Sequence, residues 1–290
     1  MSMKSSLKGK TIFVTGASRG IGAEIAKRAA SDGANVVLAA KTIEPHQKLP
    51  GTLPEIAAEC EKLGGQALVV RMDLRDISQI QAAAEAAVEA FGGIDALVNN
   101  ASVQTFTKTA DTTAKQFDLL FDINARGTFF ITQACLPHLK RSLNPHILTI
   151  ASPINMDPRW FAERLPRTIS KYAMSMMVCG WAEELKVDGI ASTGLWPRHA
   201  VATMAVKVFS PATYEGCRDP KIMADAAHWI LTQPAINVTG RFFLDDEALS
   251  EKGLSQSEID NYWLHPTKRS RTSSFLDYDE RLTPLGSPGS

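Results

Sequence analysis

A chain of 290 residues can form one large α/β domain or two small ones, and its composition does not require the second. Lys+Arg and Asp+Glu number 31 each, so no overall charge favours nucleic acid or an anionic membrane, and a small molecule is the better default partner. The N-terminal segment lacks a secretory apolar stretch, and no apolar run reaches the roughly 20 residues of a membrane span, so we expect a cytoplasmic protein.

Six short apolar runs follow one another along the chain, separated by segments of helical composition. They do not alternate apolar with polar residues, which favours strands buried on both faces of a parallel sheet. Right-handed crossovers between such strands give a doubly wound arrangement. We therefore predict an α/β fold, a single Rossmann-type parallel sheet with helices on both faces, with strands at residues 11–15, 35–40, 67–73, 95–99, 146–152 and 189–196.

Several helices are also indicated. Residues 23–30 have helical composition, and the alanine-rich residues 76–91 end at Gly92-Gly93, a helix stop signal. Helices are also predicted near residues 119–140 and 170–184. An apolar face on this pair would suit a homodimer or homotetramer interface, but burial within one chain would give the same pattern. Three prolines and one glycine between Lys41 and Glu55 predict an irregular loop after the second strand.

The C-terminal part differs in composition from the rest. Residues 1–250 carry the βα alternation, whereas residues 251–290 are polar and lack a clear period. This extension is interpreted as an arm over the fold or a partly disordered end, and the sequence does not choose between them. The four scattered cysteines favour buried reduced thiols over disulfides or a zinc site, so no metal is expected; they are Cys60, Cys135, Cys179 and Cys217.

A glycine-rich loop stands where the first strand gives way to a helix. Its sequence is TGASRGIG, residues 15–22. Glycines there let the backbone approach a pyrophosphate, whose charge is met by the amides and dipole of the helix N-terminus. In this strand, turn and helix context the motif predicts a dinucleotide site, with a plain tight turn as the alternative; its residues are Gly16, Ser18, Arg19, Gly20, Ile21 and Gly22.

The end of the second strand indicates which dinucleotide is bound. An acidic residue there would bind the free ribose hydroxyl of NAD(H), but the sequence is Ala39-Ala40-Lys41. Arg19 supplies a second cation, and a guanidinium suits phosphate geometry. The pair predicts NADP(H), with its 2′-phosphate, although two solvated surface cations would give the same sequence.

The order of the motifs resembles that of the short-chain dehydrogenase/reductase family from about residue 10 to residue 245. GASRGIG, FGGIDALVNNAS, PINMDPRWF, SKYAMSM and LWP resemble its hydroxysteroid-dehydrogenase-like branch. Proteins of that branch can carry a C-terminal sterol-carrier domain, which we expect this chain to lack. The landmarks behind the resemblance are the glycine loop, Asp73, residues 99–102, Asn124, Ser152 and Lys171.

The resemblance implies roles for individual residues. Asp73 would bond the adenine amino group, while Asn99 and Ala101 would line the cofactor cleft. The resemblance also places Asn100 and Pro197 at the cofactor, and Thr203 would bond the carboxamide. Asn124 would hold a water in the proton relay, Ser152 would polarise the substrate oxygen, and Lys171 would bind ribose. A solvated helix residue at Asn124 and a strand-end cap at Ser152 are the simpler alternatives.

One departure from the family pattern concerns its proton-exchanging tyrosine, which stands four residues before the lysine, on the same helical face. Here that residue is Arg167. Tyr172 is adjacent to Lys171 and would point about 100° away on a helix. A guanidinium cannot take up a proton at neutral pH, but it can hydrogen-bond a developing oxyanion. Weak activity is therefore expected.

Other positions near the expected site are less decisive. His199 is a candidate acid, although a loop histidine is more often simply solvated. The resemblance also implies that the segment from Val201 to Asp219 forms a lid over the substrate. Trp160 and Phe161 are equally candidates for the substrate pocket and for the core.

Two functions of different classes follow. The first is an NADP(H)-dependent oxidoreductase that transfers hydride to or from a hydrophobic alcohol or carbonyl compound, weakly because of Arg167. The second is an NADP(H)-binding pseudoenzyme that acts through a binding surface. An introduced arginine that traps an inactive form is a third interpretation that one sequence leaves open.

Overall fold

The computed structural model describes residues 6–41, 43–44 and 51–276. Its centre is a sheet of parallel strands in the order β3-β2-β1-β4-β5-β6-β7. The order reverses between β1 and β4, as it does in a doubly wound fold. The strands are β1 Thr11–Thr15, β2 Asn35–Ala40, β3 Gln66–Arg71, β4 Ala96–Asn99, β5 His146–Thr149, β6 Ala191–Trp196 and β7 Phe242–Leu244.

The predicted fold is confirmed, and all six predicted strands are present. Burial explains the prediction, since β1, β4, β5 and β6 are buried along their whole length and so carry apolar residues without alternation. The strand β7 was missed. It has three residues, Phe242–Leu244, too few to display a period, and it adds to the edge of the sheet beside β6.

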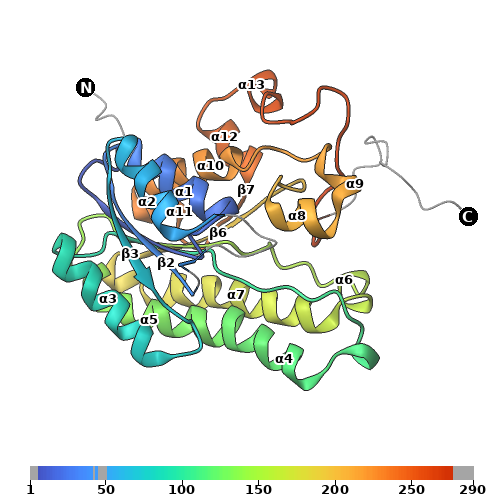
Figure 1. Ribbon diagram of the computed structural model, residues 1–290, viewed down its shortest axis with the longest axis horizontal. Helices are drawn as coiled ribbons and strands as arrows, with labels where there is room; N and C mark the ends of the chain where they lie inside the picture. Colours follow the sequence, from blue (N-terminus) through green and yellow to red (C-terminus); the bar gives the residue numbers. More distant parts are fainter. Residues whose placement is uncertain (1–5, 42, 45–50, 277–290) are drawn as a thin grey trace, which may run out of the picture.

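Helices cover both faces of the sheet (Figure 1). One apolar cluster joins the sheet to the layer that contains α1, α2 and α10, and a second joins it to the layer that contains α3, α5 and α7. These helices are α1 Gly20–Ala30, α2 Leu53–Lys62, α3 Ile77–Phe91, α5 Thr128–Leu139, α7 Leu165–Glu184 and α10 Lys221–Thr232.

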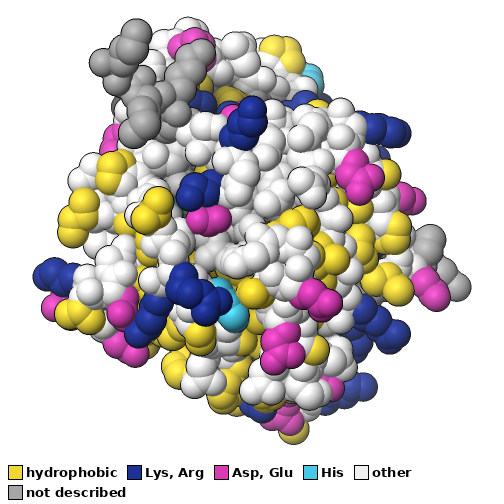
Figure 2. All heavy atoms as spheres, turned by 90° about the vertical axis from the view of Figure 1, so that its left-hand side faces the viewer, with side chains coloured by type: hydrophobic (Ala, Val, Ile, Leu, Met, Phe, Trp, Pro, Cys, Tyr) yellow, Lys and Arg dark blue, Asp and Glu magenta, His cyan; other side chains and the backbone are white. Residues whose placement is uncertain are grey.

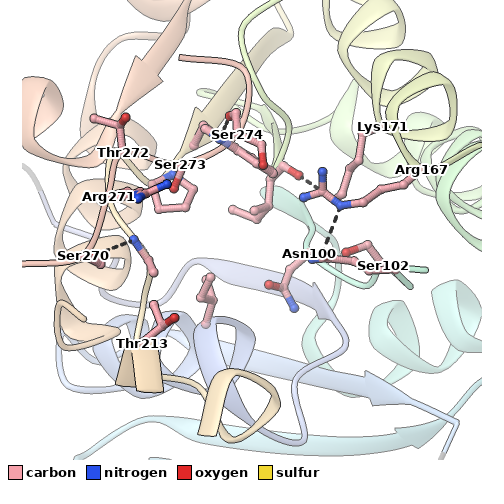
Figure 3. A pocket seen from close by; sticks show the side chains of 16 residues that line it. Asn100, Ser102, Arg167, Lys171, Thr213, Ser270, Arg271, Thr272, Ser273 and Ser274 are labelled. Carbon is pink, nitrogen blue, oxygen red and sulfur yellow. Dashed lines mark hydrogen bonds between the residues drawn. The ribbon is translucent and has the colours of Figure 1, made fainter. Parts of the chain in front are cut away.

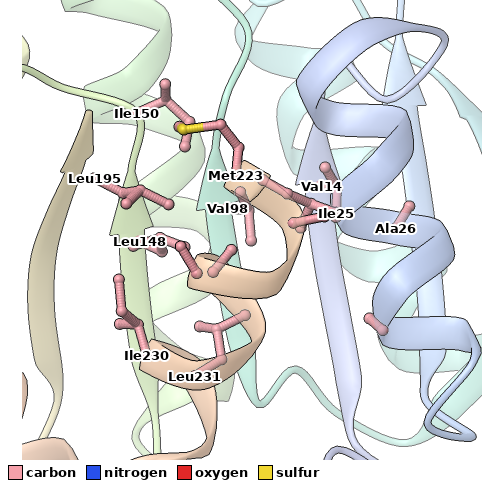
Figure 4. Close-up of a cluster of buried hydrophobic side chains, with 14 of the residues drawn as sticks. Val14, Ile25, Ala26, Val98, Leu148, Ile150, Leu195, Met223, Ile230 and Leu231 are labelled. Atoms are coloured by element: carbon pink, nitrogen blue, oxygen red, sulfur yellow. The ribbon is translucent and has the colours of Figure 1, made fainter. Parts of the chain in front are cut away.

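The helices α1 and α10 pack closely against each other and, on the same side, against the central strands (Figure 4). Ile25 of α1 and Ile230 of α10 meet Val14, Val98 and Leu148 of the central strands, and all five side chains are almost completely buried. Burying a side chain of this size contributes about 1.5–3 kcal/mol. This core fixes the start of α1 relative to the ends of the central strands.

Local sequence signals set several helix ends. Thr52 and Glu55 form a reciprocal capping box at the start of α2, so the irregular loop predicted up to Glu55 is too long, because the helix begins at Leu53. Asp76 caps α3, and Gly92 ends it in the left-handed conformation, as its position predicted. Residues 42 and 45–50 of that loop lie outside the described residues.

The helix predicted from about residue 119 begins earlier and is not uniform. It runs through α4 (Ala114–Leu120), a π-helical stretch η2 (Phe121–Gly127) and α5. The π-helical stretch contains Asn124, whose side chain is completely buried. Such stretches are rare and occur mostly at functional sites.

Residues after 250 continue the fold up to the last described residue. The helix α12 (Asp245–Glu251) crosses the expected boundary, α13 (Gln256–Asp260) follows, and residues 270–276 then return to β6. There Thr272 bridges to His199, and Phe275 is buried in the main apolar cluster. The described part of the extension is therefore an arm packed on the fold; residues 277–290 lie outside the description.

None of the described helices is long and apolar enough to cross a membrane. Cationic and anionic side chains are mixed on the face shown in Figure 2, in keeping with the zero net charge.

Several short helices complete the described fold. The short helices are η1 Thr109–Asp111, α6 Arg159–Ala162, η3 Lys186–Asp188, α8 Met204–Phe209, α9 Pro211–Tyr214 and α11 Ala235–Val238.

Candidate active site

Two adjoining cavities open at the carboxyl edge of the sheet, where the strand order reverses. Their volumes are about 420 Å³ and 350 Å³, and Asn100 and Ser102, just after β4, line both. The smaller one, here the loop cavity, lies between the glycine loop and the ends of β2 and β3. The larger one, here the helix cavity, lies between α7, the end of β6 and the arm. Ligands of doubly wound sheets bind at this place.

The glycine loop approaches the turn after β4 too closely for side chains. A Cβ on Gly16 would lie 3.0 Å from Ala101 Cα, and a Cβ on Gly22 would lie 2.4 Å from Asn100 Nδ2. Gly16 and Gly20 also have φ of 66° and 60°, in the region that favours glycine. The glycines are therefore required by backbone conformation and by packing between the first and fourth strands.

The start of α1 presents backbone amides toward these cavities. The first amides of an α-helix lack partners within the helix, and the side chain of the N-cap residue Arg19 does not cap them. Ser18 and Arg19 line the loop cavity, and Ile21 lines the helix cavity. This is the arrangement that receives a pyrophosphate.

The three charged residues predicted to bind the adenosine end of the dinucleotide all line the loop cavity: Arg19, Lys41 and Asp73. Lys41 Nζ is 3.2 Å from Asp73 Oδ2, and Arg75 binds the same carboxylate through Nε and Nη2. The pKa of Asp73 is held well below its usual range, mainly by the hydrogen bonds from Arg75 and also by Lys41. Arg19 Nη2 donates to the Gly51 carbonyl at 3.1 Å, which joins the glycine loop to the start of α2.

The turn after β4 fixes the seam between the cavities. Asn100 Nδ2 donates to the carbonyls of Thr15 and Gly16, and the Ala101 amide donates to Thr15 Oγ1. Asn99, expected to line the cleft, instead donates to Thr132 below the sheet edge and lines neither cavity. Successive side chains of a strand point to opposite sides, which places Asn99 on the far side.

Arg167 and Lys171 lie one turn apart on α7 and both line the helix cavity, facing residues 270–274 of the arm across it (Figure 3). Arg167 is only 6% exposed. Its Nε donates to Gln104 Oε1 at 3.1 Å, and its guanidinium lies 5.3 Å from the ring centre of Phe275. Burial, with Arg164 nearby, lowers the pKa of Arg167 to about 10, so it remains a cation at neutral pH.

Lys171 is the most deeply buried lysine of the site. Its Nζ donates to the Ile150 carbonyl at 3.3 Å and lies 5.6 Å from the ring centre of Trp196. Burial, followed by the charge of Arg167, lowers the pKa of Lys171 to about 7. The two cations therefore destabilise each other, and the lysine is close to losing its proton at neutral pH.

Ser152 and Asn124 lie behind the cavity wall rather than on it. Ser152 is completely buried, and its Oγ has no hydrogen-bond partner among the described residues. Asn124 exchanges hydrogen bonds with the backbone of Val103 and donates to Ser170 Oγ. The alternative of a solvated Asn124 is therefore wrong, and its side chain ties α7 to the segment after β4.

The remaining expected residues lie as follows. Pro197 lines the helix cavity, whereas Thr203 caps α8 and touches neither cavity, although its methyl group would lie 3.3 Å from a Cβ on Gly20. The hydroxyl of Tyr172 is bonded to the backbone of Asn155, away from the cavity, as its position on the helix predicted.

His199 is not solvated, contrary to the simpler expectation, and it does not reach the cavity. Its Nδ1 lies 3.1 Å from the Ser270 carbonyl, and its ring packs against Trp263. Burial, with Arg218 nearby, lowers its pKa to about 4. The histidine positions the arm instead of facing the site.

The arm is the part of the site that sequence reasoning missed. Residues 270–274 form one wall of the helix cavity, held by bonds from Trp196 Nε1 to the Ser274 carbonyl and from the Ser273 amide to the Arg198 carbonyl. Its serines and threonines show no period that distinguishes an ordered arm from a solvated tail. Gln104 and Trp196 were also missed.

The predicted lid segment contributes residues to both cavities, whereas the two aromatic residues predicted for the pocket pack against the core. Within the lid segment, Thr213 lines the helix cavity and Ala205 lines the loop cavity. Trp160 and Phe161 line neither and pack on the main apolar cluster, where Phe161 meets Tyr172 edge to face. Their core alternative is the correct one.

Comparison with known proteins agrees with this geometry. A short chain dehydrogenase family model matches residues 10–212. A hydroxysteroid dehydrogenase-like protein 2 from Danio rerio is 48% identical over 93% of this chain, which spans 65% of that relative. A crystal structure of a Mycobacterium thermoresistibile short chain dehydrogenase is 43% identical, covers 98% of this chain and 99% of its own, and has a TM-score of 0.86.

The chain thus belongs to the short-chain dehydrogenase/reductase family. Its likeness to the hydroxysteroid-dehydrogenase-like branch, expected from the motifs, is confirmed by the curated relatives, of which it spans just under two thirds. Members of the fold hold nicotinamide dinucleotides of both kinds. The crystal structure of a metagenomic short-chain oxidoreductase contains NADP. That protein is 28% identical to this chain, the match covers 82% of this chain and 97% of its own, and the TM-score is 0.69. The structure of a Mycobacterium paratuberculosis short chain dehydrogenase is bound to NAD; it is 23% identical, the match covers 84% of this chain and 99% of its own, and the TM-score is 0.71.

Proposed function

We propose that this protein is an NADP(H)-dependent oxidoreductase that transfers hydride between the dinucleotide and an alcohol or carbonyl compound. The observation that carries the proposal is the pair of adjoining cavities, one built by the glycine loop and the other by α7. They provide neighbouring places for a dinucleotide and for a second small molecule. The second molecule would enter the helix cavity.

The residues of the loop cavity fit a dinucleotide. The close approach at Gly16 and Gly22 and the uncapped start of α1 provide a cradle for pyrophosphate. Asp73 would accept from an adenine amino group by exchanging one of the bonds that its carboxylate now accepts from Arg75 and Lys41. Lys41, with its side chain 61% exposed beside the cavity, and Arg19 are cations suited to a 2′-phosphate, which is why we propose NADP(H) rather than NAD(H).

In the helix cavity the chain supplies charge and hydrogen bonds, while the nicotinamide ring, when bound, supplies or accepts the hydride. We propose that Lys171 holds ribose hydroxyls and that Arg167 stabilises negative charge on a substrate oxygen. As a permanent cation, Arg167 cannot exchange a proton. Ser152 would reach the substrate only through a small rearrangement of the cavity wall, and its unpaired hydroxyl is available for that bond.

The test begins with calorimetric titration of the purified protein with NADPH and NADH, for which we expect tighter binding of NADPH. A panel of aldehydes and ketones is then assayed with the native chain and with Arg167→Tyr, which restores a proton-exchanging phenol. We expect slow native turnover and a gain on the order of 10²- to 10⁴-fold in the variant. Arg164→Tyr, a change one turn earlier and outside the cavity, is the matched control and should give no gain.

A second candidate function is favoured by Arg167 itself. A buried cation at the position of the family's tyrosine also suits a pseudoenzyme that binds NADP(H) and acts through a surface ordered by the nucleotide. Tight NADPH binding with no turnover in the native chain or in Arg167→Tyr would favour this candidate. Measurable native turnover would exclude it.

The assembly state is part of the same proposal. We propose a homodimer or homotetramer formed through the helices predicted for it, because Phe129 of α5 and Met176 of α7 are 42% and 58% exposed. Light scattering on the purified chain tests this, and a monomer at micromolar concentration would contradict it.

A further inference from the structure

The helix cavity contains two buried basic side chains that have no partner of opposite charge among the described residues. Arg167 is 6% exposed and Lys171 is 1% exposed. Neither forms an ion pair with any residue of the described ranges, and their printed contacts are with uncharged groups. Charged side chains are almost never buried this deeply unless they are paired, because loss of hydration disfavours the charged form.

The contacts that these cations do make are those of neutral groups. Arg167 uses its Nε for Gln104 and faces the ring of Phe275, and no hydrogen bond joins its two Nη groups to a described residue. Lys171 donates to the carbonyl of Ile150 and faces the ring of Trp196. Such contacts orient the side chains but leave both charges uncompensated.

Another buried arginine of the same chain, Arg218, is paired with carboxylates, as buried charges usually are. Arg218 is 3% exposed, and its guanidinium binds the carboxylates of Asp245 and Asp246 at 3.3 Å and 3.2 Å. The chain therefore provides anions where a buried arginine supports structure. At Arg167 it provides none within the described residues.

The rest of the cavity wall is also suited to an anion. None of its described lining residues is acidic, and the arm adds a third cation, Arg271, across the cavity from Arg167 (Figure 3). Hydroxyl groups complete the wall, each able to donate a hydrogen bond to an anionic oxygen; they belong to Ser102, Thr213, Ser270, Thr272, Ser273 and Ser274.

We propose that the helix cavity is a carboxylate site, in which the two Nη groups of Arg167 bind a carboxylate of the second ligand. With Nε already used by Gln104, the free edge of the guanidinium carries the parallel donors that match the two oxygens of a carboxylate. The inference rests on the proposed function in one respect, because it makes that ligand the substrate: an alcohol or carbonyl compound that also carries a carboxylate.

The replacement of tyrosine by Arg167 then has a binding role. The arginine anchors the acid group, and the anion in turn favours the protonated form of Lys171, whose pKa is lowered to about 7 by burial and by Arg167. For a substrate that carries a carboxylate, this contact takes the place of the oxyanion contact proposed above for uncharged compounds.

The test compares hexanoate with hexanamide, which has nearly the same shape but no charge. Both are titrated calorimetrically into the native chain at pH 7.5, with and without saturating NADPH. We expect hexanoate to bind at least 10-fold more tightly than hexanamide, as charge-assisted hydrogen bonds to a buried cation predict. Equal binding of the two, or no detectable binding of hexanoate, would overturn the proposal.

Variants of Arg167 separate the anion site from general attraction. Arg167→Met should abolish the preference for hexanoate, Arg167→Lys should keep part of it, and Arg164→Met, outside the cavity, should keep all of it. Without ligand, Arg167→Met should melt at the same temperature as the native chain or higher, since it removes an unpaired buried charge. A preference that survives in Arg167→Met would contradict the assignment.

Two further results distinguish the possible failures. Inorganic phosphate that binds more tightly than hexanoate would replace the carboxylate by a phosphate group and so overturn the proposal as stated. A preference for hexanoate in a chain that does not bind NADPH would refute the proposed function but leave the carboxylate site standing. NADPH binding without a preference for hexanoate would refute the carboxylate site but leave the proposed function standing.

Discussion

The loop cavity and the helix cavity lie next to each other, yet their charged groups are arranged in different ways. In the loop cavity Asp73 is paired with Arg75 and Lys41, and the glycine loop is held by Asn100. In the helix cavity Arg167 and Lys171 are buried without a counter-ion among the described residues. In the first cavity a described carboxylate already pairs with two of the cations, and in the second no described carboxylate pairs with either basic side chain.

This difference shows where the family's chemistry has changed. The residues that would hold a dinucleotide keep the family pattern and also have structural reasons to be there, since a side chain at Gly16 or Gly22 would collide with the turn after β4. The position of the family's tyrosine has instead acquired a charge. Burying that charge is costly unless the ligand compensates it. The predictions below test the two halves in turn.

The largest effect is expected from Gly22→Ala in the loop cavity. Its Cβ would lie 2.4 Å from Asn100 Nδ2 and 2.6 Å from the Gly16 carbonyl oxygen, so the loop must shift. We expect the Kd for NADPH, measured by calorimetry, to rise on the order of 100-fold. Gly180→Ala, at an exposed site of α7 with nothing within 4 Å, is the matched control and should stabilise the chain by about 0.5–1 kcal/mol. Unchanged NADPH binding in Gly22→Ala would remove the dinucleotide from this loop.

The arm is tested next by Phe275→Ala. Phe275 is 2% exposed among Trp160, Tyr172 and Trp196, so its loss should lower the free energy of unfolding by about 3 kcal/mol, measured by urea denaturation. Phe106→Ala, where the ring is 58% exposed, should cost less than about 1 kcal/mol. Equal losses in the two variants would mean that the arm does not form a wall of the helix cavity in solution.

Charge reversal at Lys41 tests the dinucleotide preference. In Lys41→Glu a carboxylate would repel the 2′-phosphate, so the Kd for NADPH should rise about 10-fold while that for NADH changes little. Lys62→Glu makes the same charge change at the end of α2, outside both cavities, and should leave the ratio of the two constants unaltered. A parallel rise for both nucleotides in Lys41→Glu would argue against recognition of the phosphate.

The smallest effect for a single step is the change in stability per pH unit that comes from Lys171. Burial and Arg167 lower its pKa in the folded chain to about 7, whereas an unfolded lysine keeps its proton to about 10.4. Between these values the unfolded state binds more protons, so the contribution of Lys171 to stability rises with pH, by about 1 kcal/mol per unit.

Urea denaturation of the native chain and of Lys171→Met at pH 7.5, 8.5 and 9.5 measures that contribution. The stability of the native chain should rise relative to the variant over this range. Curves that run parallel would show that the ammonium is hydrated or paired in solution, which would also weaken the case for an uncompensated cation in the helix cavity.

Much of the fold could be predicted because its signals are local. The unbroken apolar runs identified the six longer strands, and Asp76 and Gly92 marked the ends of α3. Phe242–Leu244 could not be recognised, since a strand of three residues at a sheet edge has no period of its own. Near the site, the spacing of Arg167 and Lys171 placed both on one face of a helix, as α7 has them.

The amino-acid sequence by itself determined the order of strands and helices, the glycine loop and the presence of an arginine four residues before Lys171, because each depends on neighbours in the chain. Only the tertiary structure decided which groups surround them. The wall that residues 270–274 form opposite Arg167 and the lack of a described carboxylate there depend on segments about a hundred residues apart, and the burial of Ser152 depends on its contact with α7. Burial and pairing of charge are properties of such distant contacts, so no local pattern encodes them.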